Sequence, residues 1–146
     1  MTAGAKIKTA APSGTGKTVP PNTVVEGRNA VFLQLAAVWA KTLGATYIYT
    51  GVSQTDYSGY PDCRAPFIRA CERAIRLALD YPITIVTPFM KMTKADEWAL
   101  ADRLGLMELI RKETVTCYLG IPGDGCGKCP ACRLRRRGLE EYLKNG

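Results

Sequence analysis

Histidine is absent from all 146 residues of the chain. Its absence excludes histidine general bases, Ser-His-Asp and Cys-His nucleophilic sites, and every zinc site that needs an imidazole ligand. The sequence also lacks a run of about 18 consecutive apolar residues, which a membrane-spanning helix requires. Chemistry in this protein must therefore use cysteine, carboxylate, lysine or arginine side chains, or a bound cofactor.

Acidic residues are fewer than basic ones, 13 against 20, and the formal charge of +7 favours anionic partners such as nucleotides, phosphates or nucleic acid. The positive excess lies in residues 1–29 and 111–146. Residues 1–18 contain no apolar core of the kind that a signal peptide has, so we expect a cytoplasmic protein with reduced cysteines and no membrane association.

The order of predicted elements indicates an α/β protein with a parallel sheet. The apolar run 30–41 predicts a helix with Asn29 as its N-cap and Gly44 at its end. It is apolar on nearly every face, so we expect other protein segments to cover several of its sides. Strand, amphipathic helix, strand and helix then follow, in residues 46–51, 65–80, 83–87 and 93–105.

We divide the chain into three parts on this basis. Residues 1–26 are rich in proline and glycine and predict a flexible N-terminal arm. Residues 27–110 are the predicted α/β substrate-binding core, and residues 111–146 are the predicted zinc-binding C-terminal segment.

Four cysteines near the C-terminus have the spacing of a metal site. Two residues lie between Cys126 and Cys129, and two between Cys129 and Cys132. Cys117 can return across the turn 120–125 as a fourth ligand. Spacing predicts one structural zinc ion per chain, because four thiolates leave no open coordination position. An iron–sulfur cluster is the competing interpretation, and free or disulfide-paired cysteines are a third.

The arginines after these cysteines allow two interpretations. They form either a solvated helical face or a phosphate-binding surface: Arg133, Arg135, Arg136 and Arg137. The other two cysteines, Cys63 and Cys71, are interpreted as unreactive structural thiols, with Cys71 on the apolar face of its helix.

A loop rich in polar side chains, residues 51–64, follows the first predicted strand. Ligands bind at the carboxyl ends of strands in open α/β sheets, and this loop offers donors, acceptors and aromatic faces to a planar heterocycle. A simple surface turn is the alternative. Gly27-Arg28-Asn29 is equally open, since Asn29 fits a helix cap while Arg28 fits a phosphate contact.

Together these segments resemble the 7-cyano-7-deazaguanine synthase family of the queuosine pathway. The resemblance rests on Gly27-Arg28-Asn29, residues 56–64, Thr93-Lys94, and Cys117 with residues 126–135, in the family's order. It implies an adenine-nucleotide α-hydrolase-like parallel sheet, here partial, with a zinc-stapled Cys-four tail. It also implies an ATP-dependent carbon–nitrogen ligase that converts 7-carboxy-7-deazaguanine and ammonia into the nitrile.

The resemblance also assigns roles to single residues. It implies a deazaguanine pocket formed by Asp56, Tyr57, Tyr60, Asp62 and Arg64. It places Arg28, Asn29 and Lys94 near nucleotide or substrate anions. It gives zinc to Cys117, Cys126, Cys129 and Cys132.

The family's SGG-x-DS pyrophosphate loop has no counterpart in this sequence. We therefore expect a truncated or split enzyme that works as a homodimer or with a complementing N-terminal polypeptide. The alternative from another class is a non-catalytic, zinc-stapled module that binds nucleic acid or a partner protein through its basic tail. The loop around Asp56 and Arg64 favours the enzyme interpretation, because the enzyme needs this loop for its substrate and a binding module has no use for it.

Overall fold

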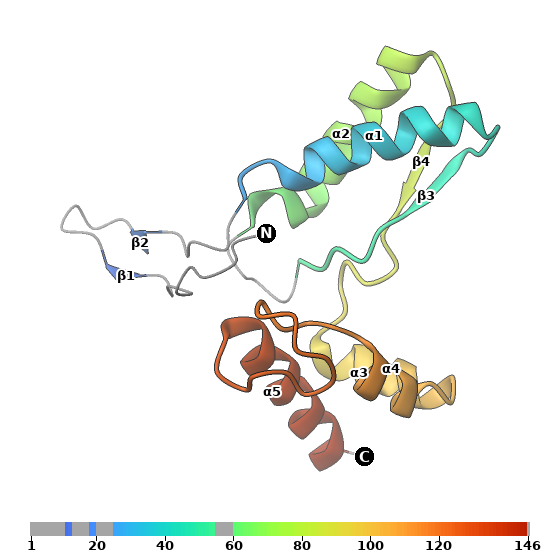
Figure 1. Cartoon of the computed structure of the whole chain (residues 1–146). Helices are drawn as coiled ribbons and strands as arrows, with labels where there is room; N and C mark the ends of the chain where they lie inside the picture. The colour runs from blue at the N-terminus through green and yellow to red at the C-terminus, as the bar shows by residue number, and fades with distance from the viewer. Residues whose placement is uncertain (1–10, 13–17, 20–24, 55–59, 146) are drawn as a thin grey trace. The chain divides into compact units, whose positions relative to one another are not determined.

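The computed structural model describes residues 11–12, 18–19, 25–54 and 60–145, and the chain forms two compact units. We refer to Val25–Met92 as the strand unit, and to Thr93–Gly146 together with Met1–Val24 as the cysteine unit (Figure 1). Each unit has a cluster of buried residues of its own. The predicted division at residues 26 and 110 stays a prediction.

The strand unit contains two parallel strands with two helices packed on them. Helix α1 (Arg28–Thr42) leads into β3 (Tyr47–Tyr49), and helix α2 (Ala65–Leu79) leads into β4 (Thr84–Val86). The strands pair in parallel, with Ile48 opposite Ile85. Helices α1 and α2 pack on β3 and β4 respectively and on each other (Figure 1). This confirms the predicted mixed α/β class and its small parallel sheet.

The core of the strand unit follows the predicted amphipathic pattern of α2. Ile68, Cys71 and Ile75 lie on one face of the helix and are buried, as expected for Cys71. Ile83 and Ile85 from the second strand region complete this layer. Burial of apolar side chains between the helices and the sheet therefore holds the unit together.

Helix α1 departs from two expectations. Its N-cap is Gly27, which has a positive φ of 69°, and not Asn29, whose side chain is used elsewhere. Only one stripe of α1 is buried, formed by Leu33, Ala37 and Ala40. The described part of the chain does not supply the expected cover on its other sides. There the apolar side chains are exposed: Val31, Phe32, Leu35, Val38, Trp39 and Leu43.

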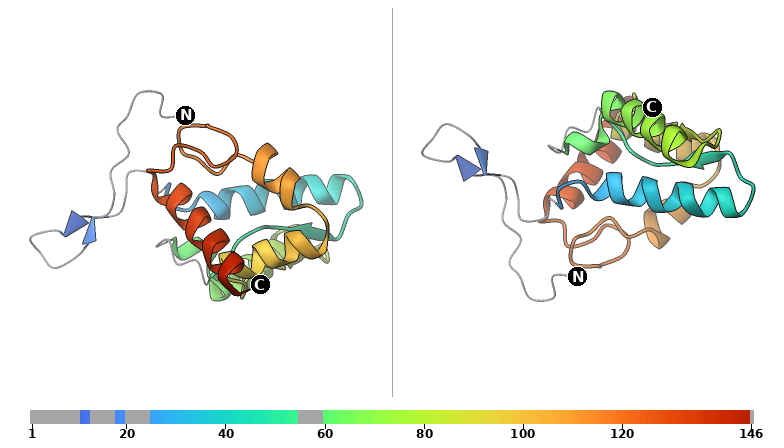
Figure 2. Two further views of the ribbon diagram at one scale, coloured as in Figure 1. Left: turned by 90° about the horizontal axis from the view of Figure 1, so that it is seen from below. Right: turned by 90° about the horizontal axis from the view of Figure 1, so that it is seen from above.

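The described residues of the cysteine unit form three helices. Helix α3 (Lys94–Arg103) begins with the predicted capping box, in which Thr93 and Asp96 satisfy each other's backbone N–H groups, and the chain leaves it through Gly105 at φ 68°. Helix α4 (Met107–Glu113) follows, and α5 (Pro130–Asn145) packs against α3 (Figure 2).

Three further short elements complete the described chain. Strands β1 (Ala11–Pro12) and β2 (Thr18–Val19) pair antiparallel, and the 3-10 helix η1 (Pro61–Cys63) precedes α2. Most of the predicted N-terminal arm lies outside the described residues. In the described part, no helix combines the length and apolar content needed to cross a membrane.

Candidate metal centre and substrate loop

The four C-terminal cysteines converge, as predicted from their spacing. Their sulfur atoms all lie within 4.8 Å of one another. Cys117 follows α4, Cys126 and Cys129 belong to the loop before α5, and Cys132 lies in the first turn of α5. All six cysteines of the chain are free thiols, which excludes disulfide pairing among them in this structure.

The sulfur positions fit one tetrahedral ion. Sulfurs placed about 2.3 Å from a zinc ion at tetrahedral corners lie about 3.8 Å apart. Here the Cys126 and Cys132 sulfurs are 4.0 Å apart, and those of Cys129 and Cys132 are 3.3 Å apart. Three of the four residues are buried and Cys126 is half-buried. The donor set is therefore a closed group of soft ligands, which suits a structural metal ion.

Backbone N–H groups surround the sulfurs and stabilise negative charge on them. The N–H groups of Lys128 and Cys129 donate to the Cys126 sulfur at 3.4 and 3.3 Å, and that of Leu119 donates to the Cys117 sulfur at 3.4 Å. Burial alone raises the pKa of the Cys117 thiol, but backbone donors outweigh it and lower that pKa to about 6. This loop is therefore built to hold thiolate, the form that binds metal.

The pKa of Cys132 is shifted in the opposite direction to that of Cys117. Burial, together with the proton that Cys132 keeps in its hydrogen bond with the Cys129 sulfur, raises the Cys132 pKa to about 12. Four thiols crowded in one pocket cannot all ionise without a cation, because each thiolate repels the next. A metal ion would replace these protons.

Gly125 closes the loop around the sulfurs. Its φ is +67°, and a Cβ atom there would lie 2.5 Å from the Cys132 sulfur and 2.9 Å from the Cys117 Cβ. The position thus needs glycine for its backbone conformation and for the space that the two cysteines occupy.

The predicted substrate residues partly come together at the first turn of α1. The Asn29 backbone N–H donates to Asp62 Oδ2 at 2.9 Å, and the Asn29 side-chain amide donates to the Asp62 carbonyl at 3.3 Å. The Arg28 guanidinium lies 5.8 Å from the centroid of the Tyr60 ring. Arg64 is exposed and donates from Nε to the Pro61 carbonyl at 3.2 Å. Two segments of the predicted site, residues 28–29 and 60–64, thus share one region of the strand unit.

The structure describes one of the three other predicted residues. Asp56 and Tyr57 fall outside the described residues. Lys94 is the first residue of α3 in the cysteine unit, where its ammonium lies 2.8 Å from both carboxylate oxygens of Glu97.

The loop after β3 runs beside the chain that follows β4. The N–H of Thr50 donates to the Val86 carbonyl at 3.0 Å, and that of Gln54 donates to the Met90 carbonyl at 3.1 Å. The carboxyl ends of both strands therefore lead into adjacent segments, the arrangement at which open α/β sheets bind ligands.

Sequence reasoning missed the contact between Asn29 and Asp62, since 33 residues separate the two and no local pattern joins them. It also misplaced Arg135, which is neither on a solvated face nor on a phosphate-binding surface but is buried. Spacing held a usable signal for Arg135: it lies three residues after Cys132, on the same face of α5.

The geometry defines a class of protein: a mixed α/β chain with a polar loop at its strand ends and a cluster of four thiols that could hold a metal ion. A family model described as "Queuosine biosynthesis protein QueC" matches residues 2–143. The chain belongs to this family, in agreement with the resemblance found in the sequence.

Curated relatives agree with this assignment. The chain is 60% identical over 123 residues to the 7-cyano-7-deazaguanine synthase of Bacteroides fragilis (strain YCH46) and 59% identical over 124 residues to that of Phocaeicola vulgatus. These matches cover 84% and 85% of this chain and 56% of each relative. The chain thus spans just over half the length of these relatives.

Proposed function

We propose that this chain belongs to an ATP-dependent carbon–nitrogen ligase that converts 7-carboxy-7-deazaguanine and ammonia into 7-cyano-7-deazaguanine in queuosine biosynthesis. The observation that carries the proposal is the 60% identity, over 84% of the chain, to a protein named as that synthase. The proposal includes an adenine-nucleotide α-hydrolase-like fold, of which β3 and β4 would be part. It also includes a cytoplasmic location.

The first turn of α1 and the loop after β3 are the proposed substrate site. A deazaguanine presents N–H donors and a flat ring, and its carboxylate is an anion. In the proposed site, Arg64 offers positive charge, and Tyr60 with Arg28 offers a ring and a guanidinium side by side. Asp56, Tyr57 and Asp62 would add carboxylate and phenol groups, with Asn29 and Lys94 near the anions.

Zinc is the ion that we propose for the four thiols. It would be structural, because four protein ligands leave no position for substrate or water. Its task would be to fix the loop 117–129 to α5. The buried cluster of that region consists of Cys117, Cys129 and Cys132, so few other apolar side chains hold the loop in place.

The nucleotide part of the site would come from residues that this sequence does not contain, in a complementing N-terminal polypeptide. Two observations support such a partner. The relatives are longer than their match to this chain. The apolar side of α1 is also exposed in the strand unit, where further protein could pack.

Two arms of one assay test the proposal. The chain is incubated with 7-carboxy-7-deazaguanine, ammonia and ATP, either alone or with a polypeptide carrying those residues of the B. fragilis relative that lie outside the match. Nitrile measured by mass spectrometry is expected only with both polypeptides. The complete B. fragilis relative is the positive control. Turnover by the chain alone would overturn the split, and a bound but inactive pair would overturn the ligase assignment.

The basic-tail alternative is weakened by the arginines themselves. Arg135 is buried, and Arg136 donates to the Gly127 carbonyl at 3.1 Å, so two of the four arginines have contacts within the tail.

A further inference from the structure

Arg135 places a positive charge inside the cysteine unit. Its side chain is only 9% exposed. Burial lowers the pKa of the guanidinium, yet an arginine keeps its charge at any ordinary pH. A buried charge is costly unless polar groups surround it, so the contacts of this guanidinium show what the fold gains from it.

The hydrogen bonds of the guanidinium all go to one short stretch of chain, residues 110–116. Nη1 donates to the hydroxyls of Thr114 and Thr116, both at 2.8 Å. Nη2 donates to the carbonyls of Ile110 and Arg111 at 2.7 and 3.2 Å. The planar fork of the guanidinium therefore holds the end of α4 and the residues that lead directly to Cys117.

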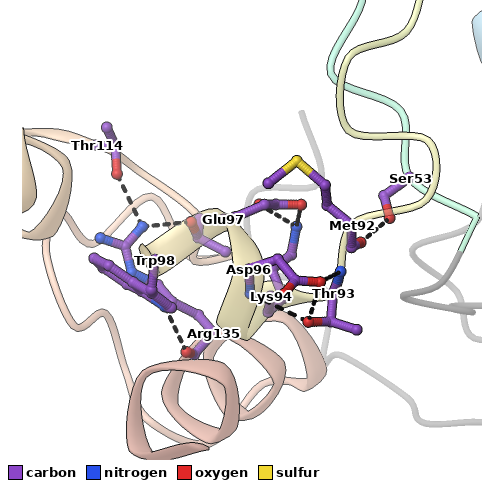
Figure 3. A network of polar contacts seen from close by, with 10 residues as sticks. Ser53, Met92, Thr93, Lys94, Asp96, Glu97, Trp98, Thr114 and Arg135 are labelled. Atoms are coloured by element: carbon purple, nitrogen blue, oxygen red, sulfur yellow. Dashed lines mark hydrogen bonds and ion pairs between the residues drawn. The ribbon is translucent and has the colours of Figure 1, made fainter. Parts of the chain in front are cut away.

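Trp98 of α3 covers the guanidinium from another side. The guanidinium carbon lies 5.2 Å from the centroid of the Trp98 ring, and the indole N–H donates to the Arg135 carbonyl at 3.3 Å. Figure 3 shows Trp98 and Thr114 on either side of this side chain. The ring limits the positions open to the arginine, because it occupies the space through which the guanidinium would move.

The four cysteines differ in how the chain brings them together. Cys126, Cys129 and Cys132 are close in sequence, and their loop and helix bring them together locally. Cys117 precedes them by nine residues or more and belongs to a different segment. Something other than the ion must hold that segment next to α5 if the site is to be formed before metal binds.

We propose that Arg135 is a positioning residue for the metal centre: it clamps residues 110–116 to α5 and so holds the Cys117 sulfur within reach of the other three. The inference rests on the proposed zinc site. Cys132 and Arg135 lie one turn apart on α5, while Thr116 directly precedes Cys117. The clamp thus joins the two ligand segments next to the ligands themselves. Because Cys117 is ordered before the ion binds, metal binding loses less conformational entropy.

Metal affinity and ligand number together test the clamp in the full chain. Zinc affinity is measured by competition with a chelator, and the absorption of the Co²⁺-loaded protein reports the number of thiolate ligands. Wild type is compared with Arg135→Met and Arg135→Lys. Arg137→Met, an exposed arginine of the same helix, is the matched control. Cys117→Ser supplies the reference spectrum of a three-thiolate site.

Wild type is expected to bind one zinc ion per chain with a four-thiolate cobalt spectrum. Arg135→Met should weaken zinc binding by about 10- to 100-fold, the usual effect of losing an outer-shell partner, and its cobalt spectrum should shift towards that of Cys117→Ser. Arg135→Lys keeps the charge without the planar fork, so its zinc affinity should lie between those of wild type and Arg135→Met. Arg137→Met should match wild type.

A merely structural role would lower the unfolding temperature and leave four thiolates on cobalt, and that result would overturn the clamp. Thr116→Val with Thr114→Val removes two acceptors and leaves the arginine in place. This pair keeps the test decisive if Arg135→Met fails to fold, and an unchanged zinc affinity would then overturn the clamp. Wild type without zinc, or with iron and sulfide, would overturn the zinc proposal itself and the inference with it.

Discussion

The carboxylate of Asp62 is buried at the amino end of α1, where it accepts the backbone N–H of Asn29. The first turn of a helix leaves its N–H groups without partners in the helix, and Gly27 has no side chain with which to cap them. Asp62 therefore does from a distance what a capping side chain does locally. It also carries a charge that the amino end of a helix dipole stabilises.

Asp62→Ala should lower the free energy of unfolding of the strand unit by about 1–3 kcal/mol, because it removes a charged acceptor from the part-buried N–H of Asn29. Urea unfolding followed by circular dichroism measures the change. Glu26→Ala, an exposed carboxylate just before α1, should stay within about 0.5 kcal/mol of wild type. Equal stability of the two variants would mean that Asp62 does not support α1 and would leave only its proposed substrate role.

At the residue scale, sequence predicts local chemistry well and distant contacts poorly. The convergence of Cys126, Cys129 and Cys132 followed from their spacing, because only two residues lie between each ligand and the next. The partnership of Asp62 with Asn29 depends on how separate segments pack, and no short pattern records that packing. The burial of Arg135 had a local signal in its place one turn after Cys132, which was not used. The family resemblance named Asp62 and Asn29 as site residues without indicating that they contact each other.

At the scale of elements, capping and periodicity gave most of the helices and both paired strands of the strand unit. The capping box of α3 and the positive-φ glycine after it needed only four or five adjacent residues to recognise. Helix α4 was not predicted: it has seven residues, too few for a clear period, and no buried residue. Helix α5 was indicated only as a helical face in one interpretation of its arginines.

Helices α3 and α5 cross closely at a glycine. A Cβ atom on Gly138 would lie 2.3 Å from Lys94 Cβ and 2.9 Å from the Lys94 carbonyl carbon. The backbone carbon cannot move aside as a flexible side chain would. Gly138 thus sets the distance between the two helices, and glycine is retained in mid-helix although alanine is the better helix former.

Gly138→Ala should therefore destabilise the cysteine unit by about 1–3 kcal/mol, the usual cost of overpacking a close contact. On an open helix the same change would stabilise by roughly 0.5–1 kcal/mol, so the sign separates the two cases. Thermal unfolding of the zinc-loaded chain gives the answer. Glu140→Ala, an exposed position two residues further along α5, is the control and should change little. A higher midpoint for Gly138→Ala would contradict the close crossing.

At the scale of the whole molecule, the two tryptophans lie in opposite environments. Trp98 is 5% exposed in the cysteine unit, whereas Trp39 is 69% exposed on the apolar side of α1, beside Leu35 and Phe32. Contiguous apolar side chains of this size on a surface mark an interaction site. The fully apolar pattern of α1 had indicated cover on several sides, and the described chain supplies it on one side only.

Trp39 can report whether the proposed complementing polypeptide supplies that cover. Quenching of tryptophan fluorescence by acrylamide should fall when the remaining residues of the B. fragilis relative are added, because Trp39 would become buried. Trp39→Phe leaves only the buried Trp98 and should show no such fall. Phe32→Gln on α1 should weaken binding of the added polypeptide, while Arg73→Gln, an exposed position on α2, should not.

Two results would contradict this assignment of the α1 surface. One is unchanged quenching of Trp39 when sedimentation shows that the two polypeptides are bound, since the added residues would then lie elsewhere. The other is a fall in Trp39 quenching as the concentration of the chain alone rises. That result would assign the surface to a second copy, because apolar side chains leave water when a symmetric pair buries the same face of both partners.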